Sequence, residues 1–128
     1  MTIDALTAYV HVEDVQRSTE FYGRLGLELE STHEVGGELV WALVARPGES
    51  TAARLMLARA SGPIDATNQA VLFYCWAPDV RGLHDRLAAA GVEVGDVEPR
   101  FYMPAGEFRL VDPDGYVVLI GQLPDQAL

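Results

Sequence analysis

Lysine is absent from this sequence, so all nine basic side chains are arginine, and they stand against 19 aspartate and glutamate residues. The net charge is therefore −10 at neutral pH. A phosphate backbone repels such a protein, which argues against a nucleic-acid partner. A cationic ligand would be attracted to it, although solubility alone is the simpler explanation of the charge.

Cysteine and long apolar runs are also scarce. The single cysteine, Cys75, excludes an internal disulfide, and its apolar neighbours in the sequence favour a buried structural thiol over a reactive one. No run approaches the roughly 20 apolar residues that span a membrane, and residues 1–6 do not resemble a signal peptide. We therefore expect a cytoplasmic protein with no membrane partner.

What the sequence does contain is an internal repeat. The segment 9–26 matches the segment 74–91 without a gap, at an offset of 65 residues. Each copy has an apolar stretch, then an aspartate (Asp14 or Asp79), then apolar residues at helical spacing and a final glycine. The aspartate suits a helix N-cap, and the glycine suits the left-handed residue that ends a helix. The chain therefore contains two copies of one supersecondary unit.

Each copy is predicted to contain a strand, a helix and three further strands. Apolar or alternating runs bounded by turn residues locate the strands, and Asp112-Pro113-Asp114-Gly115 is a typical turn. We place repeat one at 4–60, a linker at 61–68 and repeat two at 69–122, within a single domain of residues 1–128. The predicted strands are 6–12, 27–33, 38–45 and 52–59 in the first repeat, and 70–77, 92–98, 107–111 and 116–122 in the second.

The predicted fold class is α+β, in which two βαβββ repeats form a curved, mostly antiparallel sheet around a concave cleft. One repeat cannot cover its own sheet, and pairing two of them creates the concave face. Because side chains alternate along a strand, every second residue of each first strand is expected to face the cleft.

These motifs resemble those of the vicinal oxygen chelate superfamily, which includes glyoxalase I, extradiol dioxygenases, and fosfomycin and bleomycin resistance proteins. The matching segments are Val12–Ser18, Phe21–Leu27, Asp79–His84 and Asp112–Tyr116. The resemblance extends from about residue 5 to residue 122 and implies the paired βαβββ fold, together with a homodimer. It leaves the function open, because this fold hosts many chemistries.

In metal-using members of that superfamily, the metal ligands come from the first and fourth strands of each repeat. The corresponding positions here are Thr7, Met56, Leu72 and Leu119, and the windows 53–58, 71–76 and 116–121 around the last three contain no His, Asp or Glu. A divalent ion needs several donor atoms in one shell, which aliphatic and thioether groups do not supply. We therefore expect no metal and no other cofactor, as in the metal-free bleomycin-resistance branch.

The cleft is instead predicted to bind a small organic ligand between aromatic and apolar walls. Each stacking or cation–ring contact contributes about 0.5–2 kcal/mol. His11 could act as a general base, although a hydrogen-bonded wall residue is the simpler interpretation, and Arg54 could pair with a ligand carboxylate or with Glu107. The predicted ligand-binding residues are Thr7, Tyr9, His11, Trp41, Arg54, Met56, Leu72, Tyr74, Trp76, Tyr102 and Leu119.

Four functions stay open at this point. The preferred hypothesis is a binding protein without turnover, which sequesters a small molecule such as an antibiotic. The resemblance also implies a metal-dependent lyase, isomerase or dioxygenase. A cofactor-free enzyme could use His11, Tyr74 or Glu107 as acid and base. A regulatory or structural role, with the cleft filled by its own side chains, is the weakest of the four.

Overall fold

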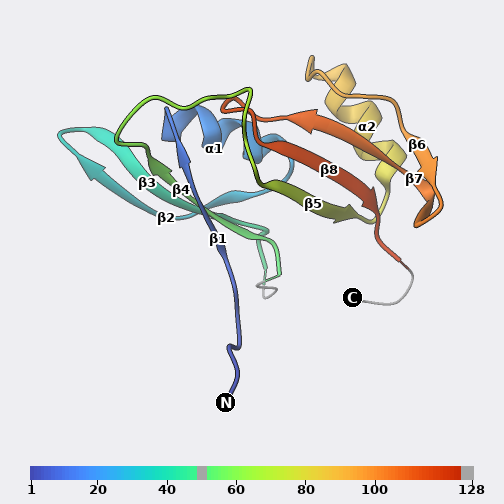
Figure 1. Ribbon diagram of the computed structural model, residues 1–128, viewed down its shortest axis with the longest axis horizontal. Helices are drawn as coiled ribbons and strands as arrows, with labels where there is room; N and C mark the ends of the chain where they lie inside the picture. Colours follow the sequence, from blue (N-terminus) through green and yellow to red (C-terminus); the bar gives the residue numbers. More distant parts are fainter. Residues whose placement is uncertain (49–51, 125–128) are drawn as a thin grey trace. The chain divides into compact units, whose positions relative to one another are not determined.

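Figure 1 shows the computed structural model of the protein, which describes residues 1–48 and 52–124. The chain divides into two compact units, Met1–Ile64 and Asp65–Leu128, and each is described by itself. The boundary between the units lies inside the predicted linker at 61–68. The grouping of both repeats into a single domain stays a prediction.

The first unit contains a helix and a four-stranded sheet (Figure 1). Strand β1 (Ala8–Val12) leads into helix α1 (Val15–Arg24), which is followed by β2 (Glu28–Val35), β3 (Glu38–Ala45) and β4 (Arg54–Arg59). The strand order is β1-β4-β3-β2, with β1 parallel to β4 and the other neighbours antiparallel. Helix α1 packs on one face of this sheet, against β2, β3 and β4.

The second unit repeats this topology. Strand β5 (Leu72–Ala77) leads into helix α2 (Val80–Ala89), which is followed by β6 (Glu98–Arg100), β7 (Met103–Val111) and β8 (Val117–Gln122). The strand order is β5-β8-β7-β6, again with one parallel pair, β5 and β8. Helix α2 packs against β5, β7 and β8.

The predicted helix ends are confirmed in both units. The Asp14 side chain accepts a hydrogen bond from the Arg17 backbone N–H at 3.2 Å, and Asp79 does the same for Gly82 at 3.0 Å. Gly26 and Gly91 have φ angles of 92° and 83°, which is the left-handed conformation that other residues rarely adopt. The matching caps explain why both helices are ten residues long.

Each unit buries one face of its sheet beneath its helix. Side chains alternate along the strands, so the residues between the predicted cleft residues point toward the helix. Burying each of these aliphatic or aromatic side chains contributes roughly 1.5–3 kcal/mol. The buried side chains include Val10, Val12, Val44, Leu55 and Leu57 in the first unit, and Phe108, Leu110, Val118 and Ile120 in the second.

The predicted strand at 92–98 is wrong. Residues 92–97 form no strand, and β6 comprises only three residues. The backbone N–H of Gly95 does donate to the Arg109 carbonyl at 2.8 Å, but the Gly95 carbonyl accepts from the His84 ring of α2 at 3.0 Å. A side chain of the helix therefore replaces a bond of the sheet, and pairing with β7 becomes regular only near Glu98. Strand β7 also begins earlier than predicted, at Met103.

The predicted fold class is confirmed as α+β with two βαβββ halves, each with a mostly antiparallel sheet. Within residues 1–48 and 52–124, no helix is long and apolar enough to cross a membrane. The turn at Asp112–Gly115 is also confirmed, because the Asp112 carboxylate accepts the backbone N–H groups of Asp114 and Tyr116, each at 2.9 Å.

Candidate ligand-binding faces

The face of the first sheet that α1 leaves uncovered carries five of the predicted ligand-binding residues. Tyr9 of β1 lies opposite Met56 of β4, and both His11 and Trp41 lie opposite Ala58. Residues that pair in this way point to the same side of a sheet. The structure therefore brings together Tyr9, His11, Trp41, Arg54 and Met56.

Two of the rings on this face, those of Tyr9 and His11, are exposed to solvent. Tyr9 is 54% exposed, and its ring packs edge-on against His11 with centroids 5.7 Å apart. Trp41 and Met56 are half-buried. Thr7 lies outside the strand, one residue before β1, and is also half-buried.

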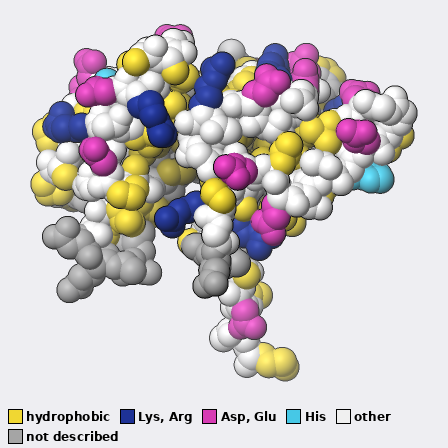
Figure 2. Space-filling model, turned by 180° about the vertical axis from the view of Figure 1, so that it is seen from behind, with side chains coloured by type: hydrophobic (Ala, Val, Ile, Leu, Met, Phe, Trp, Pro, Cys, Tyr) yellow, Lys and Arg dark blue, Asp and Glu magenta, His cyan; other side chains and the backbone are white. Residues whose placement is uncertain are grey.

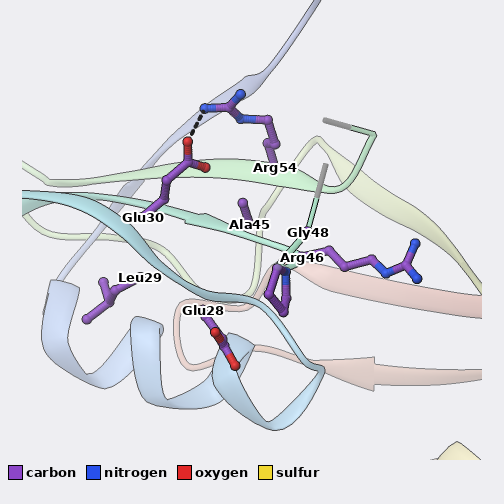
Figure 3. A pocket seen from close by; sticks show the side chains of 8 residues that line it. Glu28, Leu29, Glu30, Ala45, Arg46, Gly48 and Arg54 are labelled. Carbon is purple, nitrogen blue, oxygen red and sulfur yellow. Dashed lines mark hydrogen bonds and ion pairs between the residues drawn. The ribbon is translucent and has the colours of Figure 1, made fainter. Parts of the chain in front are cut away.

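Arg54 pairs with Glu30 of β2, at 3.2 Å between Nη2 and Oε1. Figure 3 shows the two side chains reaching toward each other. Glu107, the partner suggested from the sequence, belongs to the other unit, and that pairing stays a prediction. The Nε atom of Arg54 is buried and has no hydrogen-bond acceptor in the described part of the chain. A buried donor without an acceptor costs about 1–3 kcal/mol. Arg54 thus has one N–H to offer to another acceptor.

A hollow of about 330 Å³ lies at this end of the sheet (Figure 3). Its walls come from β2, β3, β4 and the segment after β3, and Arg54 is the one predicted ligand-binding residue among them. The hollow therefore differs from the aromatic-walled site that the sequence predicted. The lining residues are Glu28, Leu29, Glu30, Ala45, Arg46, Pro47, Gly48 and Arg54.

The uncovered face of the second sheet carries four more predicted residues. Leu72 lies opposite Val117, and Tyr74 lies opposite Leu119. Leu72 is 53% and Trp76 43% exposed, and the Tyr74 and Trp76 ring centroids are 5.0 Å apart. Leu72, Tyr74, Trp76 and Leu119 therefore form an apolar, aromatic surface on one side of β5 and β8.

A carboxylate network lies on the same face. The Glu107 side chain, 6% exposed, accepts a hydrogen bond from the Tyr74 hydroxyl at 2.6 Å on Oε2 and one from the Tyr102 hydroxyl at 2.6 Å on Oε1. Arg100 Nε lies 3.4 Å from Oε1 and also donates to it, while its Nη2 donates to Glu98 at 2.9 Å. We call Tyr74, Arg100, Tyr102 and Glu107 the Glu107 network.

The Glu107 network explains the position of Tyr102 and includes Arg100, a residue that the sequence did not suggest. Tyr102 lies between β6 and β7 and is 53% exposed, yet its hydroxyl returns to Glu107 on the sheet. Arg100 was not predicted as a site residue, and Glu107 was named only as a possible acid or base or as a partner of Arg54. The sequence does not reveal the hairpin that brings residues 100 and 102 back over β7.

Gly121 makes room for the network. Tyr74 on β5 crosses β8 to reach Glu107 on β7, and Gly121 is the residue of β8 that lies opposite both Trp76 and Glu107. A Cβ atom on Gly121 would lie 2.6 Å from the Tyr74 hydroxyl oxygen and 2.7 Å from the Met103 methyl. Both separations are too short for real atoms, so a side chain here would displace the tyrosine.

The pKa values of Glu107, Tyr74 and Tyr102 are all shifted away from neutral pH. Burial favours a higher pKa for the Glu107 carboxyl, but hydrogen bonds from Tyr102, Tyr74 and Arg100 outweigh it and lower the pKa. Burial and the bond to Glu107 raise the pKa of Tyr74, and the bond to Glu107 raises that of Tyr102. Glu107 is therefore a carboxylate and both tyrosines are neutral phenols near pH 7.

The described residues do not fit a divalent metal ion. No three His, Cys, Asp or Glu side chains in residues 1–48 and 52–124 are grouped so that they could hold one. The register sets Met56 beside Tyr9 and Leu119 beside Tyr74, and these are the fourth-strand positions at which the resemblance implies a metal ligand. The Glu107 oxygens already accept hydrogen bonds from two hydroxyls and a guanidinium, which a cation would have to displace.

Comparisons with known proteins agree with this fold. A family model described as the Glyoxalase/Bleomycin resistance protein/Dioxygenase superfamily matches residues 2–120. No curated protein sequence matches the chain.

Solved structures with a similar fold include binding proteins and an enzyme. A bleomycin-binding protein complexed with bleomycin is 20% identical, with a TM-score of 0.67, over 94% of this chain and 98% of that one. TnmS3, an antibiotic binding protein from Streptomyces sp. CB03234, is 24% identical, with a TM-score of 0.73, over 95% and 98%. A trypanothione-dependent glyoxalase I of Leishmania major is 24% identical, with a TM-score of 0.69, over 94% and 87%. At these identities the likeness concerns the fold.

Proposed function

The chain belongs to the glyoxalase/bleomycin resistance protein/dioxygenase superfamily, and from this premise we propose that it binds a small organic molecule without a metal ion. The proposed contacts are the residues predicted from the sequence, on the faces that the two helices leave uncovered. The observation that carries the proposal is the exposure of Tyr9, Leu72 and Trp76 on these faces.

Exposed rings on an otherwise ordinary sheet favour a ligand. A sheet face that meets only water commonly carries polar side chains, whereas Tyr9 and Trp76 leave apolar surface in solvent. Covering such surface contributes about 25 cal/mol for each Å² removed from water. A flat or extended organic molecule would gain this energy, together with stacking on the rings.

Sequestration is better supported than proton-transfer catalysis. A general acid or base works best with a pKa near the working pH. In the Glu107 network the pKa values move the other way, down for the carboxyl and up for Tyr74. The donor positions of metal-using relatives hold Met56, Leu72 and Leu119, which supports a role that needs no metal. We therefore favour binding without turnover.

A homodimer is part of the same proposal, from the resemblance to relatives that commonly dimerise. Figure 2 shows apolar side chains reaching the surface among charged ones. Light scattering after size exclusion measures the mass of the particle. A mass of twice 13.9 kDa is expected, and a monomer at all concentrations would contradict the dimer but not the ligand.

Isothermal titration tests the binding function. We would titrate bleomycin, other cationic antibiotics and a panel of neutral aromatic compounds into the full chain. Trp76→Ala is expected to weaken a ligand of the second face by about tenfold, since it removes a stacking partner. The matched control is Val35→Ala, which trims an exposed apolar side chain at the end of β2.

Two results would oppose the proposal. Absence of binding heat and of thermal stabilisation across the panel would remove its support. Stoichiometric metal in protein purified without chelators, measured by inorganic mass spectrometry, would instead favour a metal-dependent enzyme.

A further inference from the structure

The Glu107 network determines the direction of every hydrogen bond that its two tyrosines can make. An ionised carboxylate can only accept, so the protons in the 2.6 Å contacts belong to the hydroxyls of Tyr74 and Tyr102. A phenol has one O–H. Once this proton points at Glu107, the phenol oxygen has only lone pairs left for any other partner.

We infer that the second face selects ligands that present N–H or O–H donors to the oxygens of Tyr74 and Tyr102. This inference rests on the proposed binding function and adds the polarity of the ligand to it. A ligand group that only accepts hydrogen bonds, such as a ketone or ester, would meet a second acceptor and gain nothing there. An amide, alcohol or amine would instead donate a hydrogen bond to one of these oxygens.

The network also strengthens these acceptors. A hydroxyl that donates to a charged acceptor becomes a better acceptor itself, because hydrogen bonds in a chain polarise one another. The charges around the carboxylate are nearly balanced, with Glu98 and Glu107 close to Arg100, and Arg109 on the same side of β7. The face therefore offers directed acceptors more than a strong negative field, and neutral donors fit it as well as cations do.

The apolar surroundings position such a ligand. Trp76 lies beside Tyr74 and Phe101 beside Tyr102, with ring centroids 5.0 Å and 5.2 Å apart. Phe101 is 96% exposed, so its ring is available to a partner. A flat molecule stacked on these rings would bring its polar edge to the phenol oxygens.

Two small probes of nearly the same shape test the inference. Benzamide carries an NH₂ group where acetophenone carries a methyl group, and both are neutral. We would titrate each into the ¹⁵N-labelled full chain and follow the amide signals of residues 72–76 and 100–107. Benzamide is expected to bind about three- to tenfold more tightly than acetophenone, the usual effect of one hydrogen bond.

Variants distinguish a preference for hydrogen-bond donors from a purely structural role of the Glu107 network. Tyr102→Phe removes one acceptor, so it should lower the affinity for benzamide about threefold or more and leave acetophenone unchanged. Glu107→Gln should bring the two affinities closer, because an amide side chain can donate to one phenol and turn its proton outward. Glu93→Gln, at an exposed position of the same unit, is the matched control and should change neither.

The outcomes distinguish this inference from the function on which it rests. Equal affinities for the two probes in the wild type, or an equal loss of both in Glu107→Gln, would overturn the donor preference and leave a merely structural network. Binding of other compounds in that case would still support the proposed function. Absence of any shift with either probe would overturn the inference, and silence of the whole panel would overturn both.

Discussion

Replacing Gly121 with alanine is the most direct test of how the second sheet is arranged. The new Cβ would lie 2.6 Å from the Tyr74 hydroxyl oxygen and 2.7 Å from the Met103 methyl. The methionine can turn its terminal methyl away, but the tyrosine ring is rigid and must swing away from Glu107. The φ angle of Gly121 is not in the left-handed region, so the backbone itself accepts alanine.

The expected cost follows from two opposing effects. Loss of a hydrogen bond to an ionised carboxylate costs about 1.5–3 kcal/mol. Alanine in place of a strand glycine recovers about 0.5–1 kcal/mol by reducing the freedom of the unfolded chain. We therefore expect Gly121→Ala to lower the free energy of unfolding by about 1–2 kcal/mol, or the melting temperature by roughly 3–8 °C.

A double-mutant cycle assigns this cost to the tyrosine hydroxyl. Urea and thermal unfolding would be measured for the wild type, Gly121→Ala, Tyr74→Phe and the double variant. Phenylalanine lacks the atom nearest to the new Cβ, so alanine should cost little in that background. Gly23→Ala is the matched control: nothing lies within 4 Å of its Cβ position in α1, and it should stabilise the protein by about 0.5–1 kcal/mol.

Two results would refute this reasoning. The Gly121→Ala variant could have the same free energy of unfolding as the wild type, which would mean that the Tyr74–Glu107 hydrogen bond contributes nothing to stability. It could also cost the same with phenylalanine at position 74, which would place the strain on Met103 or on the backbone instead.

Two further predictions concern single residues of the second unit. The pKa of Glu107 is lowered in the folded state, so its stabilising effect should be complete above about pH 4.5 and be lost as the pH falls through the folded pKa. The difference in melting temperature between the wild type and Glu107→Gln should therefore shrink on acidification. A difference that stays constant with pH would contradict this prediction. Gly115→Ala should destabilise by more than about 2 kcal/mol in urea unfolding, because φ is +87° there and a Cβ would collide with the Ala66 carbonyl; a cost no greater than that of Gly62→Ala, which has open space, would contradict it.

The repeat made most of the fold predictable. Two aspartates and two glycines at the same offset determine where both helices begin and end, because caps act through local backbone geometry. Strand β3 has the predicted bounds of 38–45. The prediction failed at 92–98, where two valines alternate with Glu93 but a tertiary bond from His84 to Gly95 takes the place of sheet pairing. The alternation of apolar and polar residues indicates which side chains favour burial, but it does not predict a hydrogen bond from a helix side chain such as His84.

For the candidate site, the sequence predicted only which face of each strand a residue occupies. Once the first strands were located, alternation placed Tyr9 and His11 on one face of β1, and Leu72, Tyr74 and Trp76 on one face of β5. The partners of these side chains depend on register across strands and on hairpin geometry, which the sequence does not reveal. The bond between Arg54 and Glu30 was therefore not foreseen.

The Glu107 network supports the proposal that this surface binds an organic molecule rather than a metal ion. The Tyr74 and Tyr102 hydroxyls and Arg100 Nε all donate to the Glu107 carboxylate, so each phenol oxygen keeps only lone pairs for a further partner. A divalent cation would have to displace Arg100 and both hydroxyls to reach the Glu107 oxygens, and among the described residues no three His, Cys, Asp or Glu side chains are grouped to hold it. Proton transfer would require ionising a phenol beside a carboxylate, which electrostatic repulsion opposes. A flat molecule with donors at its edge requires neither change, because it uses the rings and lone pairs as they already stand.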